Sequence, residues 1–243
     1  DPSRLPAYAR AVAPVRYRQA VSESTLQLRD GAFALAGLNF SDELVDWIGP
    51  QVSFAVLTES NFNAGNQAGL GWVLALSSQD QDGARRFLQR FWQTRSLAGT
   101  DLQITRYRGI GLISGRGALL GRDPQPIATA LIDDDLLLLA SGRGALEQAL
   151  DVSQLDSLHL LGDERLADDL KSFGSGVAFL TASPAAMQRW LGVPSVIADR
   201  DDLTGLVGAL VSHGTDLDLK ALVHFRDDVI PGVDGLTDAE ALL

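Results

Sequence analysis

Two short apolar runs around three consecutive aspartates form the clearest structural pattern in the chain. Residues 126–132 and 136–140 are almost entirely apolar, and Asp133, Asp134 and Asp135 separate them. Runs of this length between turn residues are typical of strands, and Asp tolerates the positive φ that tight hairpins need. Ser141-Gly142 then leads into a short amphipathic segment that ends at Leu150. The pattern predicts strand, turn, strand and helix at the centre of a sheet.

Similar patterns predict strands and helices along most of the chain. Further strands are expected at 52–58, 70–77, 102–107, 110–114, 176–181, 203–212 and 216–225. The last of these alternates apolar and polar residues, which predicts one wet face. A short helix is expected at 42–48, where Gly49-Pro50 would end it. Further helices are expected after Asp80, at 163–173 and after Ser183-Pro184. Residues 1–20, with three prolines, predict an extended or broken-helical lead-in.

Most of the predicted strands are joined as hairpins, which decides the expected fold class. Hairpin connections give antiparallel pairing, and the helix after Asp80 has one apolar face that must be buried. We therefore expect an α+β fold, a largely antiparallel sheet of hairpins with helices packed on one face. A single domain over residues 1–243 fits this length.

The charge of the chain limits its partners. The formal net charge is -11 and the isoelectric point is near 4.6. An acidic protein of this kind is poorly suited to nucleic acid, and its net charge argues against binding an anionic membrane by charge. The charge is uneven, because arginines make the start basic and aspartates make the end acidic. We expect no nucleic-acid partner, and membrane association only through segments outside this chain.

Cysteine is absent, so disulfides, thiolate metal sites and thiol nucleophiles are excluded. No apolar run approaches the roughly 18 residues of a membrane-spanning helix. The chain starts at Asp1 and stops within a pattern at Leu243, so we expect a fragment of a longer chain. Targeting and anchor segments would lie outside it.

One loop has the position of a phosphate-binding site. Ser141, Gly142, Arg143 and Gly144 follow a strand and open a helix, where backbone N–H groups can hold an anion. However, Glu147 stands where a dinucleotide fingerprint has its third glycine. His213 and His224 are expected roughly 25 Å apart along one strand, too far to share a metal. No nucleophile elbow or zinc motif occurs. We therefore expect no cofactor, no metal and no catalytic residue.

A second candidate is the polar loop 59–69, which is rich in Asn and Gly. Such loops serve as binding loops or as mobile hairpin connections. For a partner-binding loop, the residues expected to make contact are Asn61, Phe62, Asn63 and Asn66.

Several stretches together resemble one known family. They are Gly37 to Phe40 continuing through Trp47 to Val56, Gly71 to Leu76 with the helix 84–91, Ile127 to Leu150, and Trp190-Leu191-Gly192. This set is similar to uncharacterised cyanobacterial proteins catalogued as domain of unknown function 3352, and it covers most of the chain from about Leu28. The resemblance implies a longer, membrane-anchored, extracytoplasmic protein in the periplasm or thylakoid lumen. It implies no catalytic residues.

Two functional hypotheses follow. The first is a non-catalytic domain that binds another protein in assembly or maintenance of a complex, through loop 59–69, the link 115–125 or the basic start. The alternative is a small-ligand-binding or hydrolytic domain that uses the Ser141 loop. A ligand site requires a concave pocket around Ser141 and Arg143, whereas an interaction domain requires an exposed apolar or aromatic patch.

Overall fold

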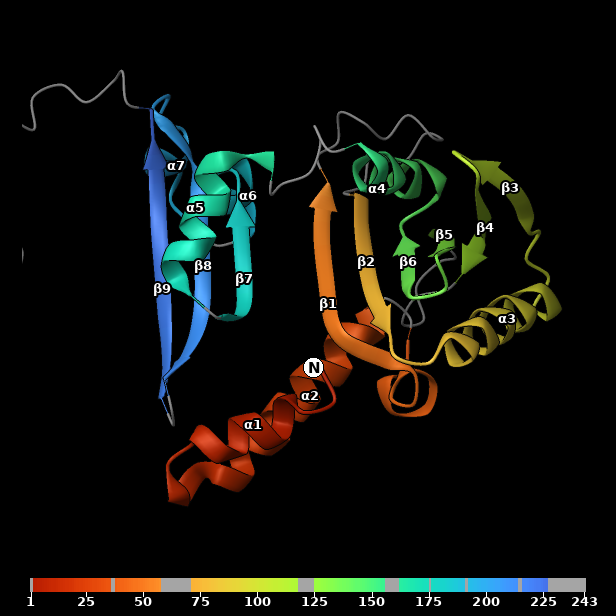
Figure 1. The fold of residues 1–243 in the computed structure, drawn as a ribbon, viewed down its shortest axis with the longest axis horizontal. Coiled ribbons are helices and arrows are strands. Elements are labelled where there is room, and N and C mark those ends of the chain that lie inside the picture. Colours follow the sequence, from red (N-terminus) through yellow and green to blue (C-terminus); the bar gives the residue numbers. More distant parts are fainter. Residues whose placement is uncertain are drawn as a thin grey trace, which may run out of the picture. The chain divides into compact units, whose positions relative to one another are not determined.

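The computed structural model describes residues 2–35, 38–57, 71–117, 125–155, 162–174, 176–190, 192–213 and 216–226. The chain divides into two compact units, residues 1–159 and 160–243, each with its own sheet (Figure 1). The sequence favoured one domain over 1–243, whereas the chain is organised around two sheets and separate cores.

A six-stranded antiparallel sheet forms the centre of the first unit. Its strand order is β1-β2-β6-β5-β4-β3. The strands are Ile48–Leu57 (β1), Gly71–Ser78 (β2), Gln103–Tyr107 (β3), Ile110–Gly117 (β4), Gln125–Ile132 (β5) and Leu136–Ala140 (β6). The β5–β6 hairpin lies in the middle, and Asp133 and Asp134 adopt positive φ angles of 48° and 63° at its turn. The prediction for this hairpin is confirmed.

Helices cover both faces of this sheet. Helix α3 (Gln81–Leu97) buries Phe87, Phe91 and Trp92 in a cluster with Leu137 and Leu139, as its apolar stripe predicts. Helix α4 (Arg143–Gln154) packs its apolar side in a cluster with Leu138 and Ala140. Alternate residues of β6 point to opposite faces, so the two helices lie on opposite sides. The α+β class is confirmed, but helices occupy both faces of this sheet because β5 and β6 are apolar on both.

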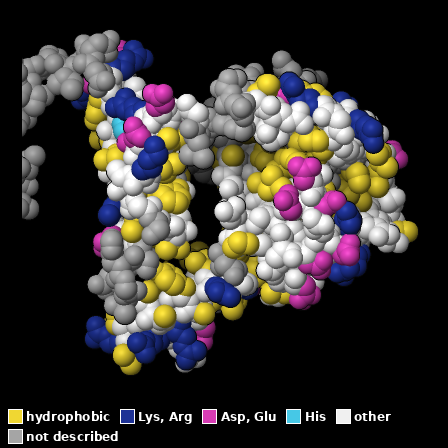
Figure 2. All heavy atoms as spheres, in the orientation of Figure 1, with side chains coloured by type: hydrophobic (Ala, Val, Ile, Leu, Met, Phe, Trp, Pro, Cys, Tyr) yellow, Lys and Arg dark blue, Asp and Glu magenta, His cyan; other side chains and the backbone are white. Residues whose placement is uncertain are grey.

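The N-terminal residues form a helical hairpin. Helix α1 (Leu5–Val12) is followed by a 3-10 turn η1 (Val15–Tyr17) and by α2 (Arg18–Leu35). Pro14 lies between them and cannot continue α1, because proline lacks the backbone N–H. The broken-helical form of the predicted lead-in is therefore present. Arginine side chains gather at the end of the hairpin that lies away from the sheet (Figure 2).

The short helix predicted at 42–48 is wrong in its extent. Only a π-helical turn η2 (Phe40–Leu44) forms, and the Asn39 side chain accepts a hydrogen bond from the Asp42 N–H. Strand β1 already begins at Ile48, with Gly49 and Pro50 inside it. Proline is tolerated here because β1 is an edge strand and its register shifts between Ile48 and Val52. A Cβ on Gly49 would lie 2.5 Å from Ser77 Oγ, so this close approach requires glycine.

The second unit contains a three-stranded antiparallel sheet in the order β7-β8-β9. Its strands are Gly176–Ala182 (β7), Leu203–His213 (β8) and Asp216–Phe225 (β9), and its helices are Glu164–Phe173 (α5), Pro184–Trp190 (α6) and Ser195–Ala198 (α7). The Asp163 side chain caps α5 by accepting hydrogen bonds from the N–H groups of Arg165 and Leu166. Leu166 and Phe173 form the core with Val207, Ala209 and Val211.

The face of β9 that carries the polar side chains is the one that meets this core. The alternation had predicted that this polar face would be exposed to solvent. Lys220 pairs with Ala209 and Leu222 with Val207, so these side chains share the face on which α5 packs. The apolar alternates point the other way, and Leu219 is 80% exposed. The prediction failed because alternation identifies two faces but not which one a helix covers.

Candidate functional site

Strand β1 carries an exposed apolar row at one edge of the six-stranded sheet. Val52, Phe54 and Val56 point to the same side, and their side chains are 36%, 62% and 38% exposed. Their partners across β2 are Leu76, Leu74 and Trp72, on the face where α3 packs. The row is exposed because the buried cluster on this face includes Leu74 and Leu76 of β2 but, within β1, only Ile48.

Trp72 extends the apolar row onto the neighbouring strand. Its ring stacks against that of Phe54 with centroids 6.4 Å apart and an interplanar angle of 24°. Trp72 is partly buried against the α3-side core. We call Val52, Phe54, Val56 and Trp72 the β1 row. An aromatic and aliphatic row of this kind is a surface suited to protein contact.

The chemical character of β1 makes it an unprotected edge. All ten residues from Ile48 to Leu57 lack a charged side chain. Exposed sheet edges in natural proteins are blunted by charged residues, by proline, by bulges or by short length. Here Pro50 and the register shift affect only the start of the strand, so Ser53 to Leu57 present regular backbone. Sequence reasoning found the strand but not its edge position, which depends on the distant pairing of β2 with β6.

The Ser141 loop, in contrast, makes contacts that join elements of the fold. Ser141 Oγ accepts a hydrogen bond from the Trp72 N–H at 2.9 Å, and the Ser141 N–H donates to the Trp72 carbonyl at 3.0 Å. Arg143 forms an ion pair with Glu147 at 2.6 Å. Gly142 has a φ of 105°, and a Cβ there would lie 3.2 Å from Pro126. Gly144 follows within α4. Ligand binding by these four residues stays a prediction.

The partner-binding residues predicted in loop 59–69, Asn61, Phe62, Asn63 and Asn66, lie outside the described residues. In the sequence this loop follows the β1 row directly.

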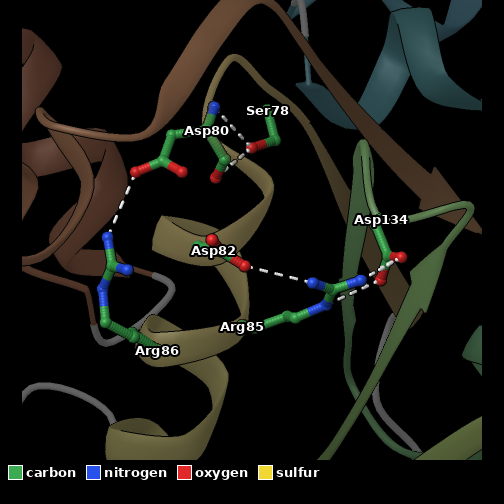
Figure 3. A network of polar contacts seen from close by, with 6 residues as sticks. All are labelled: Ser78, Asp80, Asp82, Arg85, Arg86 and Asp134. Atoms are coloured by element: carbon green, nitrogen blue, oxygen red, sulfur yellow. Dashed lines mark hydrogen bonds and ion pairs between the residues drawn. The ribbon is translucent and has the colours of Figure 1, made fainter.

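The aspartate triplet is engaged by α3. Arg85 donates from Nε to Asp134 Oδ1 at 3.1 Å, forms an ion pair with the other oxygen, and reaches Asp82 at 3.1 Å (Figure 3). The hydrogen bond to Asp134 raises the pKa of Arg85 above its ordinary value. Arg86 pairs with Asp80 at 3.1 Å in the same view. These contacts fix the turn against the helix. Among the described residues, no group of three or more His, Asp or Glu side chains could hold a metal ion.

A cavity of about 330 Å³ lies in the second unit, far in sequence from the Ser141 loop. Its wall includes Arg165, Asp169, Ser183, Thr204 and His224. His224 Nε2 lies 2.7 Å from Asp169 Oδ2, and the two side chains are only 16% and 14% exposed. The histidine expected to be solvated is therefore largely buried and lies against a carboxylate. The pair was missed because packing, not sequence spacing, brings α5 and β9 together.

The fold and these surfaces define an α+β protein with two antiparallel sheets, one of which has an apolar edge. The chain belongs to the family described as "Protein of unknown function (DUF3352)", whose model matches residues 1–234. The resemblance found in the sequence is thus confirmed. No curated protein and no solved structure matches the chain. Within the described ranges, no helix combines the length and apolar character needed to cross a membrane.

Proposed function

We propose that this chain is a non-catalytic domain that binds another protein, and that it does so by accepting a strand of that protein at β1. The observation that carries the proposal is the β1 row on an edge strand without charged residues. Its role is assembly or maintenance of a complex.

Strand addition accounts for both properties of this edge. A partner strand obtains affinity from main-chain hydrogen bonds with the outer N–H and C=O groups of β1. It obtains specificity from side chains at alternate positions, which would continue the face formed by Val52, Phe54 and Val56. The partner is therefore an extended segment with apolar residues at every second position. Loop 59–69, with Asn61, Phe62, Asn63 and Asn66, follows β1 in the sequence, which supports the proposal that it contacts the same segment.

The setting that we propose is extracytoplasmic, in the periplasm or thylakoid lumen of a cyanobacterium, in a longer membrane-anchored protein. The resemblance of the sequence supports this setting, and a chain without cysteine is compatible with an oxidising compartment. Fractionation of cells that carry the tagged full-length protein tests it, and recovery in the cytosol contradicts it.

Site-specific photo-cross-linking in the full-length protein tests the binding proposal. A photoreactive amino acid replaces Phe54 in one variant and Ile104 in a second. Ile104 is a matched control, because it is an apolar residue on the opposite edge strand and is 77% exposed. We expect one defined cross-linked protein from position 54 and none from position 104. Peptide mapping of the product is expected to locate the cross-link in an extended apolar segment of that protein.

The purified partner then allows a quantitative test. We expect Phe54→Lys to weaken its binding by at least about tenfold, a typical cost for loss of a central apolar anchor, and Ile104→Lys to leave it unchanged. Equal cross-linking from both positions contradicts a specific surface. If position 54 cross-links only to a second copy of the chain, the strand that β1 accepts belongs to that copy, and the function is self-association. Cross-links only within one chain show that the row is covered.

A second candidate function, small-ligand binding, is favoured by the cavity in the second unit. The wall of this cavity contains Asp169 and His224 together with hydroxyl groups and a guanidinium group. Such a lining suits a small polar molecule. A thermal-shift screen of polar metabolites with Asp169→Asn as the control tests this candidate. A ligand that stabilises the wild-type chain but not the variant supports it, and equal shifts in both exclude this cavity.

A further inference from the structure

The end of the α1–α2 hairpin has the opposite charge to the rest of the chain. Residues 2–22 contain four arginines and no acidic residue, in a protein with a formal net charge of -11. We call residues 10–18 the hairpin tip. It holds Arg10, Arg16 and Arg18, which are exposed, and among the described residues no ion pair involves them.

Apolar side chains stand among these arginines. Val15 is 78% exposed and Tyr17 is 48% exposed, and both belong to the short turn η1. The Arg16 guanidinium lies 4.6 Å from the Tyr17 ring centroid. Dark blue and yellow side chains are mixed at this end of the hairpin in Figure 2. A basic tip with projecting apolar and aromatic groups has the composition of an interfacial membrane anchor.

The backbone of the tip is also suited to the membrane interface. The Tyr17 N–H donates to the Pro14 carbonyl at 2.8 Å, and the Ala13 N–H donates to the Ala9 carbonyl at 3.1 Å. Arg18 Nε donates to the Ala13 carbonyl at 3.3 Å. These bonds satisfy backbone groups that would otherwise need water as the tip enters the headgroup region.

We infer that the hairpin tip binds the surface of an anionic lipid bilayer, with the arginines on lipid phosphates and with Val15 and Tyr17 among the headgroups. The negative net charge of the whole chain argues against such binding, but this average does not describe the tip, whose charged residues are all arginines. Because screening limits each surface charge to about a Debye length, a basic tip is attracted to an anionic surface even in a chain of net negative charge. The inference is independent of strand binding at β1.

An acidic protein segment is the competing partner for a basic surface. The tip favours the bilayer because it projects at the end of a hairpin, away from the sheet (Figure 1). An acidic peptide would need only the arginines, whereas the exposed Val15 and Tyr17 gain from partial burial in lipid.

Sedimentation of the purified chain with vesicles tests this inference. Vesicles of phosphatidylcholine with and without phosphatidylglycerol are compared at low and physiological salt. Each arginine near an anionic surface contributes about fivefold to partitioning, so Arg10→Gln, Arg16→Gln and Arg18→Gln together are expected to lower it about 100-fold. The matched control removes three exposed arginines of the same unit that form no ion pair among the described residues, Arg90→Gln, Arg106→Gln and Arg116→Gln, and is expected to bind like the wild type. Circular dichroism confirms that each variant is folded.

A second variant separates the lipid from an acidic peptide. Val15→Ser with Tyr17→Ser keeps every arginine, and we expect it to lower vesicle binding several-fold but to leave binding to polyglutamate unchanged. Absence of phosphatidylglycerol-dependent binding overturns the inference. Equal loss in the tip and control variants also overturns it, since it would show a general charge effect. Tip-dependent binding to polyglutamate without vesicle binding assigns the tip to an acidic protein instead.

Discussion

The two edges of the six-stranded sheet differ in how far they are protected. Strand β3 has only five residues, with Arg106 among them, and the adjoining turn is tied to α4 through Asp151. Strand β1 has ten residues, none of them charged, and exposes an apolar row. Both edges belong to the same sheet, so the difference is not a matter of general stability. It indicates that β1 is the edge available to another strand.

The largest expected effect separates the β1 row from the core beside it. Leu76 is fully buried on β2 and lies opposite Val52. Leu76→Ala is expected to lower the free energy of unfolding by about 3 kcal/mol, because a cavity remains in a close-packed cluster. Phe54→Ala is expected to cost less than about 1 kcal/mol, since its side chain is largely exposed. Urea unfolding followed by tryptophan fluorescence measures both. Similar costs for the two variants would show that the row is buried in solution.

An intermediate effect is expected at the covered part of the same sheet. The Trp92 indole N–H donates to Thr129 Oγ1 at 2.7 Å, and both side chains are buried. Thr129→Val keeps the shape but leaves the indole N–H without an acceptor, so a loss of about 1–3 kcal/mol is expected in the same unfolding measurement. In a Trp92→Phe background the donor is gone, and Thr129→Val should then cost much less. An equal cost in both backgrounds would assign the loss to packing rather than to the hydrogen bond.

The smallest effect is expected at the protected edge. The Tyr107 hydroxyl donates to Asp151 Oδ1 at 3.0 Å, and Arg108 forms an ion pair with the same carboxylate. The hydrogen bond to Asp151 raises the pKa of Arg108 above its ordinary value. Asp151→Asn weakens both contacts, and loss of a partly exposed hydrogen bond is expected to speed amide hydrogen exchange in β3 about fivefold. Exchange in β1 serves as the internal reference and should not change. Unchanged exchange in β3 would show that Asp151 does not protect this edge.

Local patterns predicted much of the fold. The β5–β6 hairpin, the apolar stripe of α3 and the helix α5 each follow from neighbouring residues, and each is present. Gly49-Pro50 was misinterpreted as the end of a helix, because the same residues also suit the irregular start of an edge strand. The signal was ambiguous locally, and the pairing with β2 decided it.

The candidate sites depend on contacts that no local pattern contains. The sequence predicts a strand that contains Val52, Phe54 and Val56. Their exposure depends on the strand order, because β6 pairs with the other side of β2 and leaves β1 at the edge of the sheet. Asp169 and His224 meet only because α5 packs on the sheet that contains β9. The arginines of the hairpin tip are visible in the sequence, whereas their position at the end of a helical hairpin follows from the turn at Pro14 and η1.

Thiol reactivity at the β1 row tests the central claim most directly, since the chain has no cysteine and one introduced thiol is unique. Phe54→Cys is compared with Leu74→Cys, its buried partner across β2, for the rate of maleimide labelling in the folded chain. The account predicts labelling at least about 100-fold faster at position 54, because reaction at position 74 requires local opening. It also predicts that the bound partner suppresses labelling at position 54. Equally slow labelling of both thiols in the chain alone would contradict an open edge at β1.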